Sequence, residues 1–263
     1  MINPISGLSY VIALGIKYPE SVQAKRLASS NIEKYGFSRI YHFHVRKTGG
    51  TSINNAFLSL GNIDGNEFRR EHNAKKIKRS LSQDRVYVSW DRYLINQGNY
   101  FYGWSHYPKH ELSVPDSTFS FAVFRDPVDR VISHYGMIKH FSDNNIDHPC
   151  MKIEKLWLSR GGGVVDFVLQ MPKEHRLNQL FMFSKSFDIN EAIDNINSLS
   201  AYYFTENLED AFSDLSSKLG VALPYLHSRK GLYSASTDEN IRNNLKELLG
   251  DEYLLFTQLR HST

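Results

Sequence analysis

The sequence has very little cysteine: Cys150 is the only one among its 263 residues. A single cysteine cannot form an intrachain disulfide, and a cysteine-based zinc site cannot be assembled from it. The excess of positive over negative charge is also small: the sequence has 31 Lys and Arg and 28 Asp and Glu, which gives a net charge of +3. A general polycation for nucleic acid has a steeper excess, so we expect no nucleic-acid partner, while a local anion site stays possible.

Long apolar runs are missing as well. The most apolar stretch, Gly7–Ile16, is shorter than the roughly 20 apolar residues of a membrane-spanning helix. Lys17 follows this stretch, whereas a secretory signal peptide has its basic region first. We therefore expect a cytoplasmic protein with no membrane partner, in a compartment that keeps Cys150 reduced.

Strand-like runs alternate with helical patterns along the chain. This alternation predicts an α/β fold with a central, mostly parallel sheet flanked by helices. We expect one domain over residues 1–263, in which residues 1–38 are a lead-in and a helix that ends at Gly36. In such sheets ligands bind beyond the carboxyl ends of the strands. The strands are expected at Arg39–Val45, Arg85–Trp90, Tyr100–Ser105, Thr118–Phe124 and Ala201–Thr205, and the later helices at Pro127–Lys139, Glu174–Phe183, Leu208–Leu219 and Asp238–Leu249.

A glycine turn, KTGGTS, follows the first expected strand and precedes a helical pattern. Gly49 and Gly50 let the backbone bend sharply and approach a ligand closely. The first amides of the helix lack intrahelical partners, and Lys47, Thr51 and Ser52 add a charge and two hydroxyls. This is a cradle for phosphate or sulfate. It is not a Walker A loop, in which the lysine follows the glycines; the alternative is a tight turn beside a solvated lysine.

A second strand-to-helix segment, FRDPVDRVISHY, begins at Phe124. Asp126 is expected to cap the helix and Pro127 to be its first residue, which accounts for both without chemistry. Arg125 and Ser133 are candidates for holding a second phosphate, with the guanidinium as a bidentate donor. We expect Ser133 on a helix face that it shares with Arg130 and that does not face the core. The alternative is an ordinary capped helix with a surface arginine.

Together, HVRKTGGTS and FRDPVDRVISHY resemble the paired cofactor signatures of sulfotransferases that use 3′-phosphoadenosine-5′-phosphosulfate (PAPS). The resemblance is greatest to the Golgi carbohydrate branch, such as the heparan sulfate O-sulfotransferases. It implies a P-loop-like three-layer fold, a first segment that holds the 5′-phosphosulfate, and a second that binds the 3′-phosphate through Arg125 and Ser133. RLNQLFMF and YYFTENLEDAF look like later landmarks of the family. The residues implied for the first segment are Arg46, Lys47, Thr48, Gly49, Gly50, Thr51 and Ser52.

Two departures and one later element qualify this likeness. Arg46 stands where relatives often carry Gln or Pro. The luminal relatives have a membrane anchor and disulfides that are not found here, so a polysaccharide acceptor in a secretory compartment is not implied. Arg229, Lys230 and Gly231 resemble the RKG element with which cytosolic sulfotransferases close over the 3′-phosphate; the alternative for these residues is a basic loop.

Sulfuryl transfer needs positive charge at the leaving phosphate oxygen and a base for the acceptor proton. Lys47 and the turn amides suit the first task. For the base we predict His106, because it follows a predicted strand at the same sheet edge and because the relatives carry a histidine after the equivalent strand. His110 and His134 are the rivals. We expect His134 on the helix surface beside Ser133.

Aromatic residues around His106 are candidates for the acceptor site. Tyr102, Trp104 and Tyr107, with His110, are placed to form a wall for a ring-shaped acceptor, although strand alternation would ordinarily bury some of them, Trp104 above all. His42 and His44 share a strand face, but no carboxylate stands at typical ligand spacing, so we expect no metal.

The sequence thus predicts a metal-independent enzyme that transfers a sulfuryl group from PAPS, leaving adenosine 3′,5′-bisphosphate (PAP). The acceptor is a hydroxyl or amine of a small natural product or an oligosaccharide. Two alternatives remain open: a P-loop nucleotide phosphotransferase, and a non-catalytic protein that binds anionic glycans. The number of subunits is not indicated.

Overall fold

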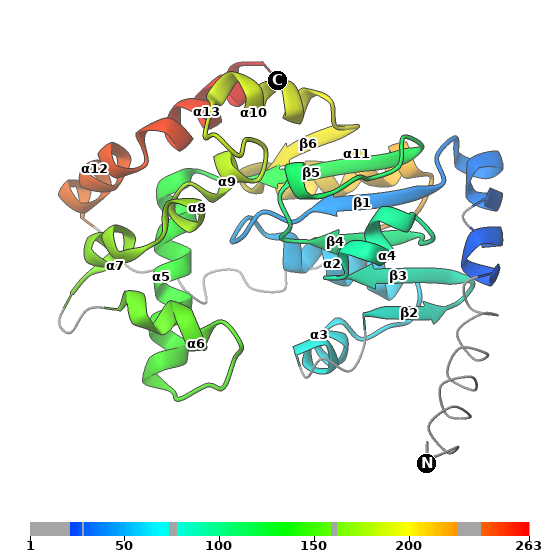
Figure 1. Cartoon of the computed structure of the whole chain (residues 1–263), viewed down its shortest axis with the longest axis horizontal. Helices are drawn as coiled ribbons and strands as arrows, with labels where there is room; N and C mark the ends of the chain where they lie inside the picture. Colours follow the sequence, from blue (N-terminus) through cyan, green and yellow to red (C-terminus); the bar gives the residue numbers. More distant parts are fainter. Residues whose placement is uncertain (1–21, 28, 74–77, 159–161, 226–237, 263) are drawn as a thin grey trace, which may run out of the picture.

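The computed structural model describes residues 22–27, 29–73, 78–158, 162–225 and 238–262. Within them, the central sheet has six strands in the order β2-β3-β4-β1-β5-β6 (Figure 1). All neighbouring strands are parallel except β2 and β3, which are antiparallel. The strands are β1 (Arg39–Phe43), β2 (Arg79–Ser82), β3 (Arg85–Ser89), β4 (Tyr102–Ser105), β5 (Thr118–Phe124) and β6 (Ala201–Phe204).

The helices connect these strands in the alternation that the sequence predicts. A helix covers residues 22–27 and 29–35 and ends at Gly36, whose φ of 76° suits a helix end. The further α-helices are α2 (Gly50–Ser59), α3 (Gly65–Asn73), α4 (Arg92–Gln97), α5 (Pro127–Asp143), α6 (Met151–Glu154), α7 (Val164–Gln170), α8 (Lys173–Arg176), α9 (Asn178–Phe181), α10 (Ile189–Asn197), α11 (Leu208–Leu219), α12 (Glu239–Leu248) and α13 (Gly250–His261), with short 3₁₀ helices η1 (Lys109–Glu111), η2 (Lys155–Trp157) and η3 (Thr205–Asn207).

Strand alternation divides the core into two layers, one on each face of the sheet. In β1, Ile40 contributes to the cluster that α2 and α11 cover, while Tyr41 and Phe43 contribute to the cluster covered by α4, α5, α10 and α13. Because β1 is central, all its residues are buried. The expected α/β arrangement, a mostly parallel sheet between two layers of helices, is confirmed.

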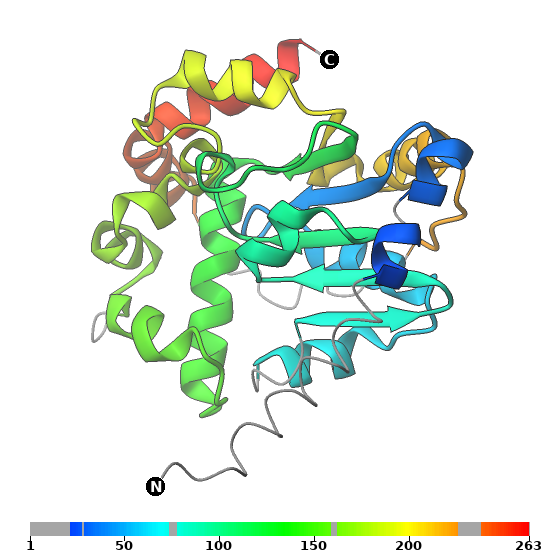
Figure 2. The same cartoon turned by 45° about the vertical axis from the view of Figure 1, so that its right-hand side comes forward.

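The carboxyl ends of the parallel strands meet at one edge of the sheet. Figures 1 and 2 show α5, α6 and α7 beyond this edge and the helix of residues 22–35 beside the opposite one. The segment after β1 carries the glycine turn, His106 follows β4, Arg125 follows β5 and Thr205 follows β6. The predicted site residues of the strand ends are therefore brought to the same edge.

The structure differs from the sequence-based expectations at several elements. Strand β2, Arg79–Ser82, is not among the expected strands. The expected helix Glu174–Phe183 is two short helices, α8 and α9, that meet at Leu177. None of the helices in the described ranges is long and apolar enough to cross a membrane, and the apolar stretch Gly7–Ile16 lies outside these ranges.

Candidate functional site

The first turn joins β1 to α2 through backbone in the left-handed region. Lys47 has a φ of 68° and Gly49, the N-cap residue, a φ of 83°. A non-glycine residue in this region is strained, and such strain gathers at functional sites. No described side chain caps α2, and its first turn holds no acidic residue. The amino end of α2, with the positive end of the helix dipole, is therefore available to an anion.

Gly50 is required because two imidazoles pack directly against it. A Cβ there would lie 2.2 Å from Cδ2 of His44 and 2.9 Å from Cε1 of His42. Both rings lie on one side of β1, stacked with centroids 5.0 Å apart. The Asn54 side chain contacts Nδ1 of both, at 3.0 and 3.3 Å. The first turn thus lies on a rigid polar layer.

The second turn has the local structure that the sequence predicts. Asp126 caps α5 by accepting from the Asp129 amide at 3.0 Å, and Pro127 is the first helical residue. The Arg125 guanidinium donates to the Lys47 carbonyl oxygen across 3.2 Å, so the two turns touch. Burial lowers the pKa of Arg125, against the nearby charges of Asp129, Glu206 and Asp126.

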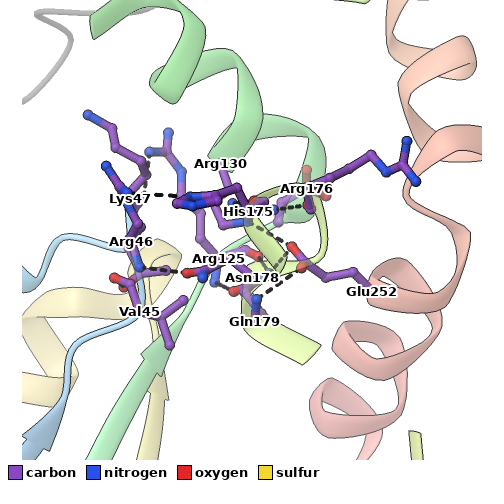
Figure 3. Close-up of polar contacts among 12 residues, drawn as sticks. Val45, Arg46, Lys47, Arg125, Arg130, His175, Arg176, Asn178, Gln179 and Glu252 are labelled. Atoms are coloured by element: carbon purple, nitrogen blue, oxygen red, sulfur yellow. Dashed lines mark hydrogen bonds and ion pairs between the residues drawn. The ribbon is translucent and has the colours of Figure 1, made fainter. Parts of the chain in front are cut away.

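Three residues from other elements bind the backbones of the two turns. The Thr205 hydroxyl lies 2.8 Å from the Thr48 carbonyl oxygen and 3.1 Å from that of Phe124. In α9, Asn178 accepts from the backbone amide of Arg46 at 3.2 Å. The next residue, Gln179, accepts from the backbone amide of Arg125 at 2.8 Å and donates to its carbonyl oxygen at 3.0 Å (Figure 3).

Arg130 is fully buried, which corrects the expectation that it lies on a helix face away from the core. Its Nε donates to Oε1 of Glu252, also fully buried, at 2.7 Å. The same guanidinium reaches the carbonyl oxygens of His175 and Arg176. Helices α6, α7, α12 and α13 all contact α5, and they leave Arg130 no route to solvent.

Arg46 turns its side chain away from the first turn. Its guanidinium forms an ion pair with Glu154 and contacts Nδ1 of His175 at 3.4 Å. The role of Arg46 in the first segment stays a prediction; in this structure its guanidinium is paired with Glu154. Burial raises the pKa of Glu154, but the hydrogen bond from His134 and the charge of Arg46 outweigh it and hold the pKa at about 2.

The expected position of His134 on the helix surface is wrong, because the residue is buried. Its Nε2 donates to Glu154 across 2.7 Å, and its ring lies against Trp157 and Phe167. Burial lowers the pKa of His134 to about 3. With Nε2 committed to a carboxylate in the core, His134 has no geometry for accepting a proton from an acceptor.

His106 has the geometry that a general base needs. Its Nδ1 is hydrogen-bonded to the backbone carbonyl oxygen of His44, which can only accept, so Nδ1 carries the hydrogen. In the neutral ring the lone pair is then on Nε2. Burial, then the charge of Arg46, lowers the pKa of His106 to about 3, so the ring is neutral at working pH. The ring is half-buried between His44 and Trp90.

Two members of the expected aromatic wall are buried in the core, which strand alternation favoured for Trp104. Tyr102 and Trp104 are 0% and 5% exposed, because they face α2, where Tyr102 stacks on Phe57 with centroids 4.0 Å apart. Trp90 and Tyr107 are half-buried at the sheet edge beside His106. Sequence reasoning missed Trp90, whose only signal was its place at the end of a predicted strand.

The remaining predicted residues are less closely tied to the turns. Ser133 is half-buried in the second turn of α5. His110 is exposed in η1, with its ring edge-to-face on Phe181. Arg229, Lys230 and Gly231 lie outside the described residues. In the described ranges no three His, Cys, Asp or Glu side chains gather as a metal site.

Comparison with known proteins identifies the segment that carries both turns. Residues 36–151 match the family model described as "Sulfotransferase family". Residues 36–151 belong to the sulfotransferase family. The matched segment contains the first turn, His106, Arg125 and Ser133, and the resemblance that the two motifs indicated is confirmed at the level of the family. No curated protein matches the sequence.

The match of residues 36–151 to the sulfotransferase family supports a reaction class, the transfer of a sulfuryl group to an acceptor. The Golgi branch of the family stays a prediction. Sequence reasoning missed Asn178, Gln179 and Thr205 as partners of the sulfotransferase turns, although RLNQLFMF and YYFTENLEDAF were noted as family landmarks. It also missed Glu154 and Glu252, for which the sequence had no signal.

Proposed function

We propose that the protein transfers the sulfuryl group of PAPS to a hydroxyl or amine of an acceptor, with Lys47 stabilising the leaving phosphate and His106 as the base. The observation that carries the proposal is the contact between two anion-binding turns, Arg125 to Lys47 at 3.2 Å, at the edge where His106 has its lone pair on Nε2. When bound, PAPS supplies an activated sulfuryl group.

The residues of the first turn suit a phosphosulfate. Gly49 has the left-handed backbone that lets the chain curl around an anion, and the amino end of α2 has neither a side-chain cap nor an acidic neighbour in its first turn. Lys47 Nζ lies 3.4 Å from Met137 Sδ, and it brings a positive charge to the turn. Thr51 and Ser52 add hydroxyl donors. For the 3′-phosphate we assign Arg125 and Ser133.

The proton and the charge have separate destinations. As the acceptor oxygen forms its bond to sulfur, Nε2 of His106 takes the acceptor proton, while the sulfur–oxygen bond to the leaving phosphate breaks. Lys47 and the amides at the start of α2 stabilise the negative charge that grows on that phosphate. The hydrogen bond from Nδ1 to the His44 carbonyl oxygen fixes the imidazole and stabilises the imidazolium.

For the acceptor we propose a small natural product or an oligosaccharide that meets Trp90 and Tyr107 beside His106. For the compartment we propose the cytoplasm, on the ground of a single cysteine.

The test is incubation with PAPS and a panel of hydroxylated small molecules, amines and oligosaccharides in EDTA. We expect release of PAP and a product heavier by one sulfo group in the mass spectrum. No PAP release with any acceptor, together with no PAP binding by calorimetry, would overturn the proposal. Magnesium-dependent ATP turnover instead would favour a phosphotransferase.

Variants assign the two roles. His106→Ala is expected to lower kcat by about 10²–10⁴ while PAP binding is kept. Lys47→Ala is expected to lower kcat by about 10²–10³. His140→Ala, an exposed histidine of α5, is the matched control. Loss of turnover in His110→Ala but not in His106→Ala would show that the base is wrongly assigned. Unchanged activity in Lys47→Ala, His106→Ala and His110→Ala alike would favour a non-catalytic binder with contaminating activity.

A further inference from the structure

Two adjacent amide side chains bind the backbones of both anion-binding turns. Asn178 holds the amide of Arg46, and Gln179 holds the amide and the carbonyl oxygen of Arg125. The two residues are 6% and 1% exposed. Because Asn178 and Gln179 are consecutive residues of α9, one short helix fixes the positions of both turns (Figure 3).

These contacts lie where the sheet can no longer set the spacing. The pairing of β1 with β5 ends at Phe43 and Ala122, and the segments that follow these two residues are not paired with each other. The backbone amides of Arg46 and Arg125 lie in this unpaired region. Gln179 hydrogen-bonds both the backbone N–H and the backbone C=O of Arg125, as a residue of a neighbouring strand would. The side-chain amides of Asn178 and Gln179 therefore replace strand pairing beyond the end of β1 and β5.

Gln179 is itself held from behind by a buried network. Its backbone amide donates to Oε2 of Glu252 at 2.9 Å and its Nε2 lies 3.0 Å from Oε1. Glu252 is paired with Arg130, which belongs to α5, the helix that the second turn begins. The path from Arg125 through Gln179 and Glu252 to Arg130 therefore leads to α5, the helix that begins just after Arg125. Such a closed and satisfied network leaves the amide little freedom to shift.

We propose that Asn178 and Gln179 are positioning residues that set the separation of the two turns, so that one nucleotide with phosphates at both ends is gripped at both at once. This inference rests on the proposed function, in which the turns hold opposite ends of PAPS. Its physical basis is effective concentration: once one phosphate is held, the other binds as an intramolecular event only if the second turn lies at the matching distance.

Nucleotide binding can distinguish residues that set the distance between the two turns from residues that only stabilise the fold. Each adenosine monophosphate engages only one turn and is insensitive to the distance between them, whereas PAP engages both. Removing a positioning amide should therefore weaken PAP selectively. Loss of a merely structural residue would weaken all three nucleotides by a common factor, or none of them.

The experiment measures calorimetric Kd values for PAP, adenosine 5′-monophosphate and adenosine 3′-monophosphate. Asn178→Leu and Gln179→Met remove the contacts to Arg46 and Arg125. Asn178→Asp keeps an acceptor for the Arg46 amide. Asn195→Leu is the matched control, because Asn195 also binds a backbone carbonyl oxygen, that of Phe183 at 2.7 Å, but contacts neither turn.

For Asn178→Leu and Gln179→Met we expect PAP to bind about tenfold more weakly, or worse, and each monophosphate to change by less than about threefold. Asn178→Asp and Asn195→Leu should keep PAP within about threefold of the wild-type protein. Equal weakening of all three nucleotides, or unchanged PAP binding, would overturn the proposal.

Thermal melting reports folding in parallel. If Gln179→Met does not fold, Asn178→Leu decides alone, because the Asn178 side chain is bonded to the backbones of Arg46 and Glu174, whereas it is Gln179 that is bonded to Glu252. If neither folds, the amides are supports of the fold and the proposal is wrong. A wild-type protein that does not bind PAP would instead refute the proposed function, so the two failures are distinguishable.

Discussion

A methyl group at Gly50 is the sharpest perturbation that the first turn offers. In Gly50→Ala the added Cβ would lie 2.2 Å from Cδ2 and 2.3 Å from Nε2 of His44, and 2.9 Å from Cε1 of His42. Cβ contacts below 3.0 Å do not occur in real structures, so the His44 ring has to move by about 0.8 Å at the least. His42 cannot make room, because it is fully buried and stacked on Phe121 at 4.6 Å.

The cost follows from this lack of space. Overpacking a rigid site costs about 1–3 kcal/mol, and the better helix propensity of alanine offsets at most about 1 kcal/mol. For a protein of this size, 1 kcal/mol lowers the melting temperature by roughly 2–4 °C. We therefore expect Gly50→Ala to melt several degrees below the wild-type protein. We also expect a loss of kcat beyond any loss of folded protein, because a shift of His44 moves the carbonyl oxygen that orients His106.

Gly250→Ala is the matched control for this experiment. Gly250 is also the first residue of its helix, α13, and a Cβ there meets nothing within 4 Å. We expect it to melt at or slightly above the wild-type temperature. If Gly50→Ala has the same melting temperature as Gly250→Ala and keeps full turnover, the two imidazoles do not pack against the first turn as described.

Two further predictions concern buried charge and acid stability. Arg130→Met leaves the Glu252 carboxylate buried without its cation, which should lower the free energy of unfolding in denaturant by about 3–5 kcal/mol. The double variant Arg130→Met with Glu252→Gln should recover part of this loss. A single variant as stable as the wild-type protein would contradict the pairing. Burial lowers the pKa of His42 to about 4 and of His106 and His134 to about 3. Below the ordinary histidine pKa of about 6.5 the unfolded chain therefore binds protons that the native protein does not, and stability falls as the pH is lowered. The urea midpoint should drop from pH 7 to pH 5, and a constant midpoint would contradict the burial of these rings.

The parts of the site that the sequence predicts are those with local causes. Gly49 has a positive φ, Asp126 caps its helix and Pro127 begins it, and each signal lies within a few residues of its effect. The central strands are predicted because their hydrophobic runs are buried on both faces. Together these signals predict that Lys47 lies in the turn after β1 and that Arg125 directly follows β5, as the structure has them.

The parts that the sequence does not predict depend on partners far along the chain. Arg130 looks like a surface arginine because its partner, Glu252, is 122 residues away. Tyr102 and Trp104 alternate onto the same strand face, but only the position of α2 decides that this face is covered. The network of Asn178 and Gln179 likewise needs three separate segments to meet.

Arg46 illustrates how such a distant partner changes the chemistry of a motif. By sequence alone the first turn has two adjacent cations, which would favour a more highly charged ligand. The Glu154 carboxylate, with a pKa of about 2, stays ionised at any working pH and balances the Arg46 charge. Lys47 and the amino end of α2 then provide the positive charge of the turn, matched to a single anionic group. In the function proposed above, the first turn therefore selects for the phosphosulfate end of PAPS, and Arg125 binds the other end.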